Sequence, residues 1–191
     1  MKVSLKPVVL AVASTLMFVG VAQAQTVKLA MIEGMSGPMG GVGQNQLKHY
    51  QYAAERFSGK QANSGVTVEI VPMDSKGSPL EALALLKKAA DDGIRFITQG
   101  NGSNVAGVLI DAVNKHNERN PGKEIVFLNY AAIDPDFTNS KCSPWHFRFD
   151  AGVDMKLEGL TNYMKDEKSI KNVYVIGQNY SFGQQVSKYT K

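Results

Sequence analysis

Residues 78–98 read SPLEALALLKKAADDGIRFIT, and this stretch decides the fold class because it contains a helix, its end and the strand that follows. Ser78 suits the N-cap, Pro79 the first helical position and Glu81 the third, which together form a capping box. Gly93 suits the position after the helix, where a positive φ is common. The predicted apolar face of the helix consists of Leu80, Leu83, Leu86 and Ala90.

The same alternation of strand and helix extends in both directions from this stretch. Short apolar runs that predict strands lie at residues 27–32, 66–71, 94–98, 125–129 and 173–177, with a further short strand at 147–149. Pro72 is expected to end the second of these. A glycine-rich loop is predicted at 34–43, followed by a helix that stops at Gly59. Further helices are predicted over 104–117, 152–166 and 183–189. The first predicted helix has an apolar face of Leu47, Tyr50, Ala54 and Phe57.

Strands separated by helices of this length predict βαβ units and therefore a parallel sheet covered on both faces. With right-handed crossovers, the fold class is α/β, a doubly wound parallel sheet flanked by helices. Ligands of such sheets bind at the carboxyl ends of the strands, where the strand order reverses. For the order 2-1-3-4-5 that point lies between the loops at 34–43 and 99–103.

The loop after the third predicted strand, Gly100-Asn101-Gly102-Ser103, is the best candidate binding site. Ser103 is placed to be the N-cap of the next helix, whose first amides lack internal partners and carry the positive end of the dipole. The Ser103 hydroxyl and the amides of Asn104 and Val105 could hold a carboxylate. The alternative is an ordinary serine cap that needs no ligand. Tyr130, after the fourth strand, could form a pocket wall or simply pack on the loop.

The N-terminal residues predict export. Lys2 and Lys6 precede an apolar run, and Ala22-Gln23-Ala24 resembles a signal-peptidase site, so residues 1–24 are interpreted as a cleaved signal peptide. The alternative, a membrane anchor, needs a longer apolar run, and no stable membrane insertion is expected. Losing the two lysines lowers the formal net charge from +4 to +2, and no dense basic stripe remains, which argues against nucleic acid.

Enzyme motifs and cofactor motifs are missing from the sequence. Neither Gly41-Val42-Gly43 nor Gly100-Asn101-Gly102 continues into a dinucleotide-binding pattern, and there is no phosphate loop or nucleophile elbow. The three histidines are scattered, so no metal site and no cofactor are predicted. The single Cys142 is expected either to be buried or to pair with a partner outside this chain.

Several of these stretches together resemble the periplasmic leucine/isoleucine/valine-binding protein family. The stretches are residues 27–38, Met73-Asp74 before Pro79, 91–94, 129–135 and 179–183. The resemblance implies that residues 25–191 are the N-terminal lobe of a two-lobe solute-binding protein whose second lobe is missing. It also implies a periplasmic location, a small-molecule ligand held between the lobes, and delivery to the membrane subunits of an ABC importer rather than catalysis.

The resemblance carries residue roles over only in part. Ser103 matches a serine that grips the ligand carboxylate, and Ala131 matches a residue whose backbone contacts the ligand. Ile133 stands where amino-acid binders have threonine, Val42 where they tend to have an aromatic, and Phe182 where they have tyrosine. Because an ammonium would lose an acceptor at Ile133, the hypothesis is a carboxylate with an apolar or aromatic body rather than a standard branched-chain amino acid. The alternatives left open are a sensor domain of the same fold and a small α/β enzyme.

Overall fold

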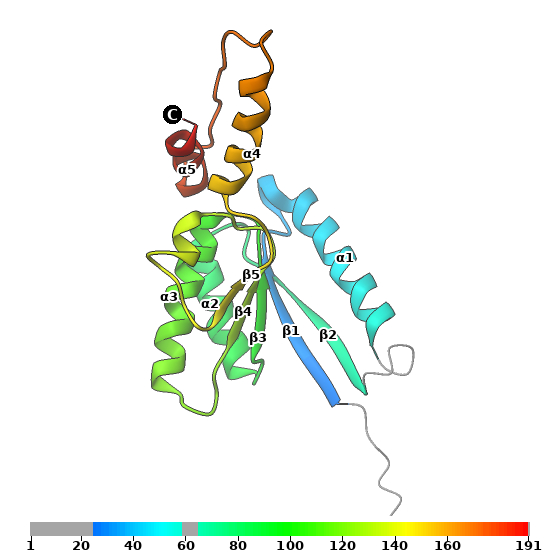
Figure 1. The fold of residues 1–191 in the computed structure, drawn as a ribbon. Coiled ribbons are helices and arrows are strands. Elements are labelled where there is room, and N and C mark those ends of the chain that lie inside the picture. The colour runs from blue at the N-terminus through cyan, green and yellow to red at the C-terminus, as the bar shows by residue number, and fades with distance from the viewer. Residues whose placement is uncertain (1–24, 59–64, 191) are drawn as a thin grey trace, which may run out of the picture.

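The computed structural model describes residues 25–58 and 65–190, and the predicted signal peptide at 1–24 lies outside them. One parallel sheet with the strand order β2-β1-β3-β4-β5 forms the centre of the molecule (Figure 1). It confirms the predicted α/β class and the order 2-1-3-4, but the fifth position is taken by residues 146–148 and not by the predicted fifth strand at 173–177. Its strands are β1 (Gln25–Glu33), β2 (Val66–Asp74), β3 (Phe96–Gln99), β4 (Val126–Asn129) and β5 (His146–Arg148).

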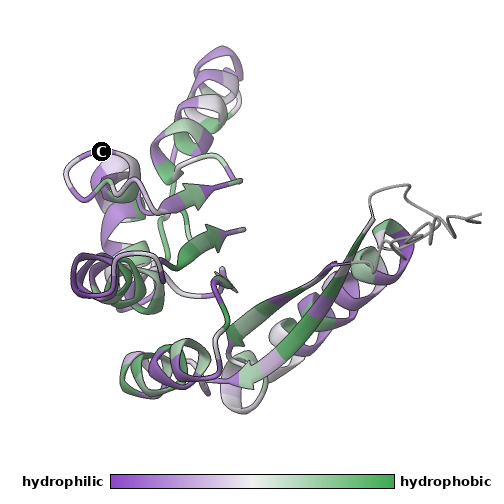
Figure 2. Cartoon of the chain, turned by 90° about the horizontal axis from the view of Figure 1, so that it is seen from below, coloured by the Kyte–Doolittle hydropathy of each residue, from purple (hydrophilic) through white to green (hydrophobic). Residues whose placement is uncertain are grey.

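Helices cover both faces of the sheet. These are α1 (Gly40–Phe57), α2 (Pro79–Asp91) and α3 (Ser103–Arg119). Two further helices, α4 (Val153–Asp166) and α5 (Ser181–Tyr189), pack on each other beyond the end of the sheet, and η1 (Gly37–Met39) and η3 (Pro135–Thr138) are short 3₁₀ turns. Figure 1 shows α1 along β1 and β2 on one face, and α2 and α3 on the other. The hydropathy view in Figure 2 shows hydrophobic residues on the strands and on one side of the neighbouring helices.

The core lies between the sheet and the α2–α3 pair. It includes Ile32 from β1, Ile97 from β3, Phe127 from β4 and Leu109 from α3, all fully buried. Burying side chains of this size removes most of their apolar surface from water, which is the main favourable contribution to folding. The core therefore fixes the positions of the carboxyl ends of the strands, and the loops of the candidate site begin at these ends.

Helix α2 confirms the predicted N-cap, first residue and C-terminal glycine, but only half of the predicted capping box forms, because the Ser78 amide donates to the Ser75 carbonyl at 2.8 Å. Ser78 is the N-cap and its hydroxyl accepts a hydrogen bond from the Glu81 amide at 3.4 Å, Pro79 is the first residue, and Gly93 follows the helix with φ +78°. The predicted apolar face is only partly right, because Leu80 is 79% exposed in the first turn. The buried face is formed by Ala82, Leu86 and Ala89.

The glycine-rich loop predicted at 34–43 is wrong in its second half, because η1 and the start of α1 occupy residues 37–43. Gly43 packs so closely on the chain that a Cβ there would clash with the carbonyl oxygen of Gly34. Helix packing therefore explains this glycine without a ligand. At the other end of α1, Phe57 is exposed rather than part of an apolar face.

Strand β2 does not end at Pro72 as predicted but continues to Asp74, with Pro72 opposite Met31 of β1. Because β2 is an edge strand, the missing amide hydrogen of Pro72 leaves no neighbouring strand without a donor. The short strand predicted at 147–149 is confirmed as β5, displaced by one residue.

The strand predicted at 173–177 is absent. Residues 171–179 have no regular structure, and Val173, Tyr174, Val175 and Ile176 are exposed. An apolar run becomes a strand only where a neighbouring strand supplies hydrogen-bond partners, and none of the described residues does so here. Within the described residues, no helix is long and apolar enough to span a membrane.

Candidate ligand-binding site

A small pocket of about 170 Å³ lies at the carboxyl edge of the sheet, next to the point where the strand order reverses between β1 and β3. Three segments form most of it: the loop after β3, the loop after β4 and the start of α5. The lining residues are Met39, Gly100, Asn101, Gly102, Ser103, Ala131, Ala132, Ile133, Tyr180 and Phe182. The pocket therefore brings together Ser103, Ala131, Ile133 and Phe182 of the predicted site.

Ser103 is the first residue of α3 and not its N-cap, which corrects the sequence prediction. The N-cap is Gly102, whose φ of +105° is easy for glycine and strained for serine. Ser103 is 4% exposed, yet no described residue hydrogen-bonds to its hydroxyl. The hydroxyl is thus not used in a cap and remains available at the pocket.

The first turn of α3 offers fewer free amides than predicted. The Val105 amide donates to the Gly102 carbonyl at 3.1 Å and is therefore occupied. The amides of Ser103 and Asn104 have no acceptor among the described residues, as expected for the first positions of a helix. These two amides lie at the positive end of the helix dipole.

The pocket lining contains one further unpaired donor and no charged side chain. The side-chain amide nitrogen of Asn101 is buried without a hydrogen-bond partner. A buried donor without an acceptor is costly, typically by about 1–3 kcal/mol. Together with the Ser103 hydroxyl and the two free amides, Asn101 makes the pocket a place where an anionic oxygen would be stabilised.

Glu33, at the end of β1, holds the loop that carries these donors. Its carboxylate accepts hydrogen bonds from the amide of Gly34 at 2.9 Å, from that of Gly100 at 3.0 Å and from that of Asn101 at 3.1 Å. The side chain is only 1% exposed. Glu33 is absent from the predicted site, although a carboxylate at the end of a buried strand is a signal that points to it.

Tyr130 does not line the pocket but supports it from behind. Its hydroxyl donates to Glu33 Oε2 at 2.5 Å, and its ring packs against Tyr50 with centroids 5.5 Å apart. Burial, followed by the charge of Glu33, raises the pKa of Tyr130 well above its ordinary value, so the phenol keeps its proton. Of the two roles considered for Tyr130, packing on the loop is the one observed.

The remaining predicted contacts lie outside the pocket. Val42 is 45% exposed on α1 and does not line it, and the Asn104 side chain is exposed, so only its amide is available. Val42 lies away from the pocket because residues 40–43, predicted as a loop, form the first turn of α1.

The structure gives no support for a metal site within the residues it describes. No group of three or more histidine, cysteine or acidic side chains is arranged to hold an ion there. His49 lies on α1, His116 on α3 and His146 on β5. Cys142 is exposed, which removes the buried alternative for this residue.

Comparisons with known proteins agree with this architecture. The family model described as "Periplasmic binding protein" matches residues 26–191. A Leu/Ile/Val-binding protein homolog 4 from Brucella abortus (strain 2308) is 34% identical over 163 residues, which cover 85% of this chain and 39% of that protein.

Two solved structures share the fold. The closed conformation of a leucine-, isoleucine-, valine-, threonine- and alanine-binding protein from Brucella ovis has a TM-score of 0.77 and 34% identity, covering 87% of this chain and 43% of its own. A solute-binding protein from R. palustris in complex with 4-hydroxybenzoate has a TM-score of 0.70 and 20% identity, covering 87% and 42%. This chain thus spans about two fifths of the length of these proteins.

Proposed function

This chain belongs to the periplasmic binding protein family, and from this premise we propose that it is one lobe of an exported solute-binding protein that captures a small carboxylate-bearing ligand for an ABC importer. In this role the protein binds and releases its ligand without changing it.

The observation that carries the proposal is the unpaired set of donors at the start of α3. Four donors have no partner among the described residues: the Ser103 hydroxyl, the backbone amides of Ser103 and Asn104, and the side-chain amide of Asn101. The Ser103 hydroxyl and the Asn101 side chain belong to residues that line a pocket without charged side chains. Hydrogen bonds to a charged acceptor contribute more than neutral ones, about 1.5–3 kcal/mol each. A carboxylate would satisfy these donors together.

The rest of the pocket favours an apolar or aromatic body on the ligand. Ile133 and Phe182 contribute apolar walls, and Tyr180 and Phe182 have ring centroids 6.1 Å apart at one side. No lining residue is a carboxylate, so the walls of this pocket present no countercharge to an ammonium. The B. ovis relative is named for binding leucine, isoleucine, valine, threonine and alanine, while the R. palustris protein of the same fold is in complex with 4-hydroxybenzoate.

A second lobe would complete the site. This pocket is small and lies at an edge of the sheet, whereas ligand pockets commonly enclose most of the ligand. The relatives are more than twice as long as this chain, and closure of two lobes about a hinge is one of the ways in which proteins enclose a ligand. We therefore expect residues 25–191 alone to bind weakly or not at all, because only one wall is present.

Export through a signal peptide at residues 1–24 fits this role. The family consists of extracytoplasmic binding proteins, and the described residues contain no membrane-spanning helix. The proposed location is the periplasm.

Isothermal titration of the two-lobe protein with leucine, isoleucine, benzoate and 4-hydroxybenzoate tests the proposal. We expect an aromatic or aliphatic acid to bind more tightly than leucine, and Ser103→Ala to weaken that binding by about tenfold or more. Ser187→Ala, an exposed serine on α5, is the matched control and should leave affinity unchanged. Tight leucine binding without binding of the acids would overturn the ligand class, and equal affinity of Ser103→Ala and wild type would overturn the site.

A further inference from the structure

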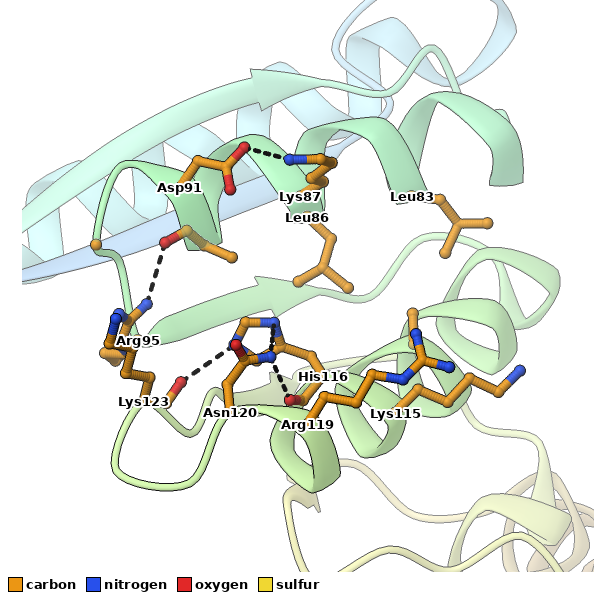
Figure 3. A pocket seen from close by; sticks show the side chains of 13 residues that line it. Leu83, Leu86, Lys87, Asp91, Arg95, Lys115, His116, Arg119, Asn120 and Lys123 are labelled. Carbon is orange, nitrogen blue, oxygen red and sulfur yellow. Dashed lines mark hydrogen bonds and ion pairs between the residues drawn. The ribbon is translucent and has the colours of Figure 1, made fainter.

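A second and larger pocket, of about 680 Å³, lies between α2 and α3 (Figure 3). It is formed by the second halves of these helices and by the turns that follow them, whereas the ligand pocket lies at the start of α3. At about 1.5 Å per residue, Ser103 and Arg119 stand roughly 24 Å apart along the α3 axis. The second pocket, called the α2–α3 groove below, is therefore separate from the ligand site.

The α2–α3 groove concentrates positive charge. Its lining contains five lysines and arginines and one carboxylate, a formal net charge of +4: Lys87, Arg95, Lys115, Arg119, Lys123 and Asp91. Residues 25–191 carry only +2 in total, so the rest of this segment has a net charge of −2. The positive charge is thus gathered on one surface rather than distributed evenly.

Most of these cations are not used by the fold. Lys87 pairs with Asp91 at 2.6 Å, and Arg95 donates to the Ala90 carbonyl at 3.2 Å. None of the described residues forms an ion pair with Arg95, Lys115, Arg119 or Lys123. Nearby Glu124 does not line the groove, and its carboxylate accepts a hydrogen bond from the Gly122 amide at 2.9 Å in its own turn.

Stabilisation of helix ends explains only part of this arrangement. A cation in the last turn of a helix interacts favourably with the dipole, which accounts for Arg119. Arg95 and Lys123 lie outside both helices, yet they extend the same charged rim. In Figure 3 they stand at one end of the groove, while Arg119 and Lys115 stand at the other.

The shape of the charge distribution identifies the chemistry of the occupant. Because the cations are spread along the rim and do not converge on one point, they suit an extended anion better than a single small one. Between them the groove has apolar lining from Leu83, Leu86, Ala90 and Ala112. An occupant that matches both features has carboxylates along one side and apolar side chains along the other.

We propose that the α2–α3 groove is a docking surface for an acidic, amphipathic segment of a protein partner. The partner's carboxylates would face Lys115, Arg119 and Lys123, and its apolar side chains would cover the half-buried Leu83 and Ala90. Docking at this end of α3 leaves the ligand pocket free, so partner and ligand can be bound at the same time.

Fluorescence anisotropy tests this with a labelled peptide of about 18 residues that carries glutamate and leucine on opposite helical faces. The purified chain is expected to bind it, and the same peptide with glutamine in place of glutamate should bind at least about tenfold more weakly. In the protein, Lys115→Glu with Arg119→Glu should weaken binding of the acidic peptide by about tenfold or more. The matched control is Lys165→Glu with Lys168→Glu, two exposed lysines outside the groove, which should change it less than about twofold.

Equal losses in the two double variants, or no binding by the wild-type chain, would overturn the proposal, provided that circular dichroism shows all proteins folded. Vesicles of phosphatidylglycerol distinguish a membrane from a protein partner: binding of vesicles that is lost in the groove variant, with no binding of the peptide, would also overturn it. The anisotropy measurement uses no small molecule that binds the ligand pocket. A negative result would therefore overturn the docking proposal without bearing on the proposed transport role.

Discussion

Two apolar runs of similar composition, Val126–Asn129 and residues 173–177, have opposite structures in this molecule. The first is β4, which pairs with β3 and β5 and buries Phe127 completely. The second has no strand beside it among the described residues, and its Ile176 is 97% exposed. Apolar residues thus create the tendency to form a strand, while a neighbouring strand edge with free hydrogen-bonding groups decides whether the strand forms.

The largest expected difference between the two runs is in core packing. Phe127→Ala should lower the free energy of unfolding by about 3–5 kcal/mol, because it removes a buried ring and leaves a cavity. Ile176→Ala in the same chain should change it by less than about 0.5 kcal/mol. Urea unfolding followed by circular dichroism measures both. A large loss for Ile176→Ala would contradict this difference between the two runs, since it would mean that residues 173–177 are packed in solution.

A smaller difference is expected for two glutamates. Glu33→Gln keeps the shape but places an NH₂ group against amides that now donate to a carboxylate, so at least one buried donor loses its acceptor. We expect a loss of about 3 kcal/mol in the free energy of unfolding. Glu167→Gln, in the exposed turn before residues 173–177, makes the same change of charge and is the control, with little effect expected.

In the two-lobe protein, Glu33→Gln should also weaken ligand binding, because Glu33 holds the loop that carries Asn101 and Ser103. If Glu33→Gln proves as stable as the Glu167→Gln control, Glu33 does not hold this loop in the way described.

The smallest of these effects depends on pH and concerns His146 in β5. Burial, reinforced by Arg148, lowers the pKa of His146 from 6.5 to about 4, and its Nε2 lies 3.1 Å from the Asn129 side-chain nitrogen. Between these two pH values the unfolded chain binds the proton and the folded chain does not, so stability should fall as pH decreases from about 6.5 to about 4. The expected loss is about 2–3 kcal/mol.

His146→Gln should remove this component, so the difference in stability between variant and wild type should depend on pH across that range. Taking this difference isolates the pH dependence that comes from the His146 imidazole, because carboxyl groups such as Asp134, whose pKa is raised by burial, contribute equally to both proteins. A constant difference between pH 4 and 6.5 would contradict the assignment.

Local signals in the sequence were reliable where one short stretch contains all the determinants. The N-cap of α2 and the parallel arrangement of the strands are examples, because they depend on neighbouring residues and on general rules for connections. Predictions of local structure failed where contacts with a segment distant in the sequence decide the conformation. Gly43 belongs to a helix because it packs on Gly34, and Pro72 continues a strand because β2 is at an edge.

The candidate site divides in the same way. The sequence predicted residues 100–103 as the centre of the candidate site, and the pocket is lined by this loop together with Ala131, Ile133 and Phe182. The sequence did not predict the contact of Glu33 with Gly100, which lie 67 positions apart, or the exact start of α3 at Ser103. The residue roles in ligand binding stay predictions until the titrations above are made.

By itself, the sequence determined the alternation of strands and helices and with it the fold class, because these follow from periodic burial and from local helix and turn signals, while the family was predicted from a resemblance of several short stretches. The tertiary structure alone decided which strand-like run becomes a strand, which carboxylate supports the binding loop, and where the cations of α2 and α3 meet. The physical reason is that hydrogen-bond partners and burial are supplied by segments far apart in the chain, so their pairing exists only after folding.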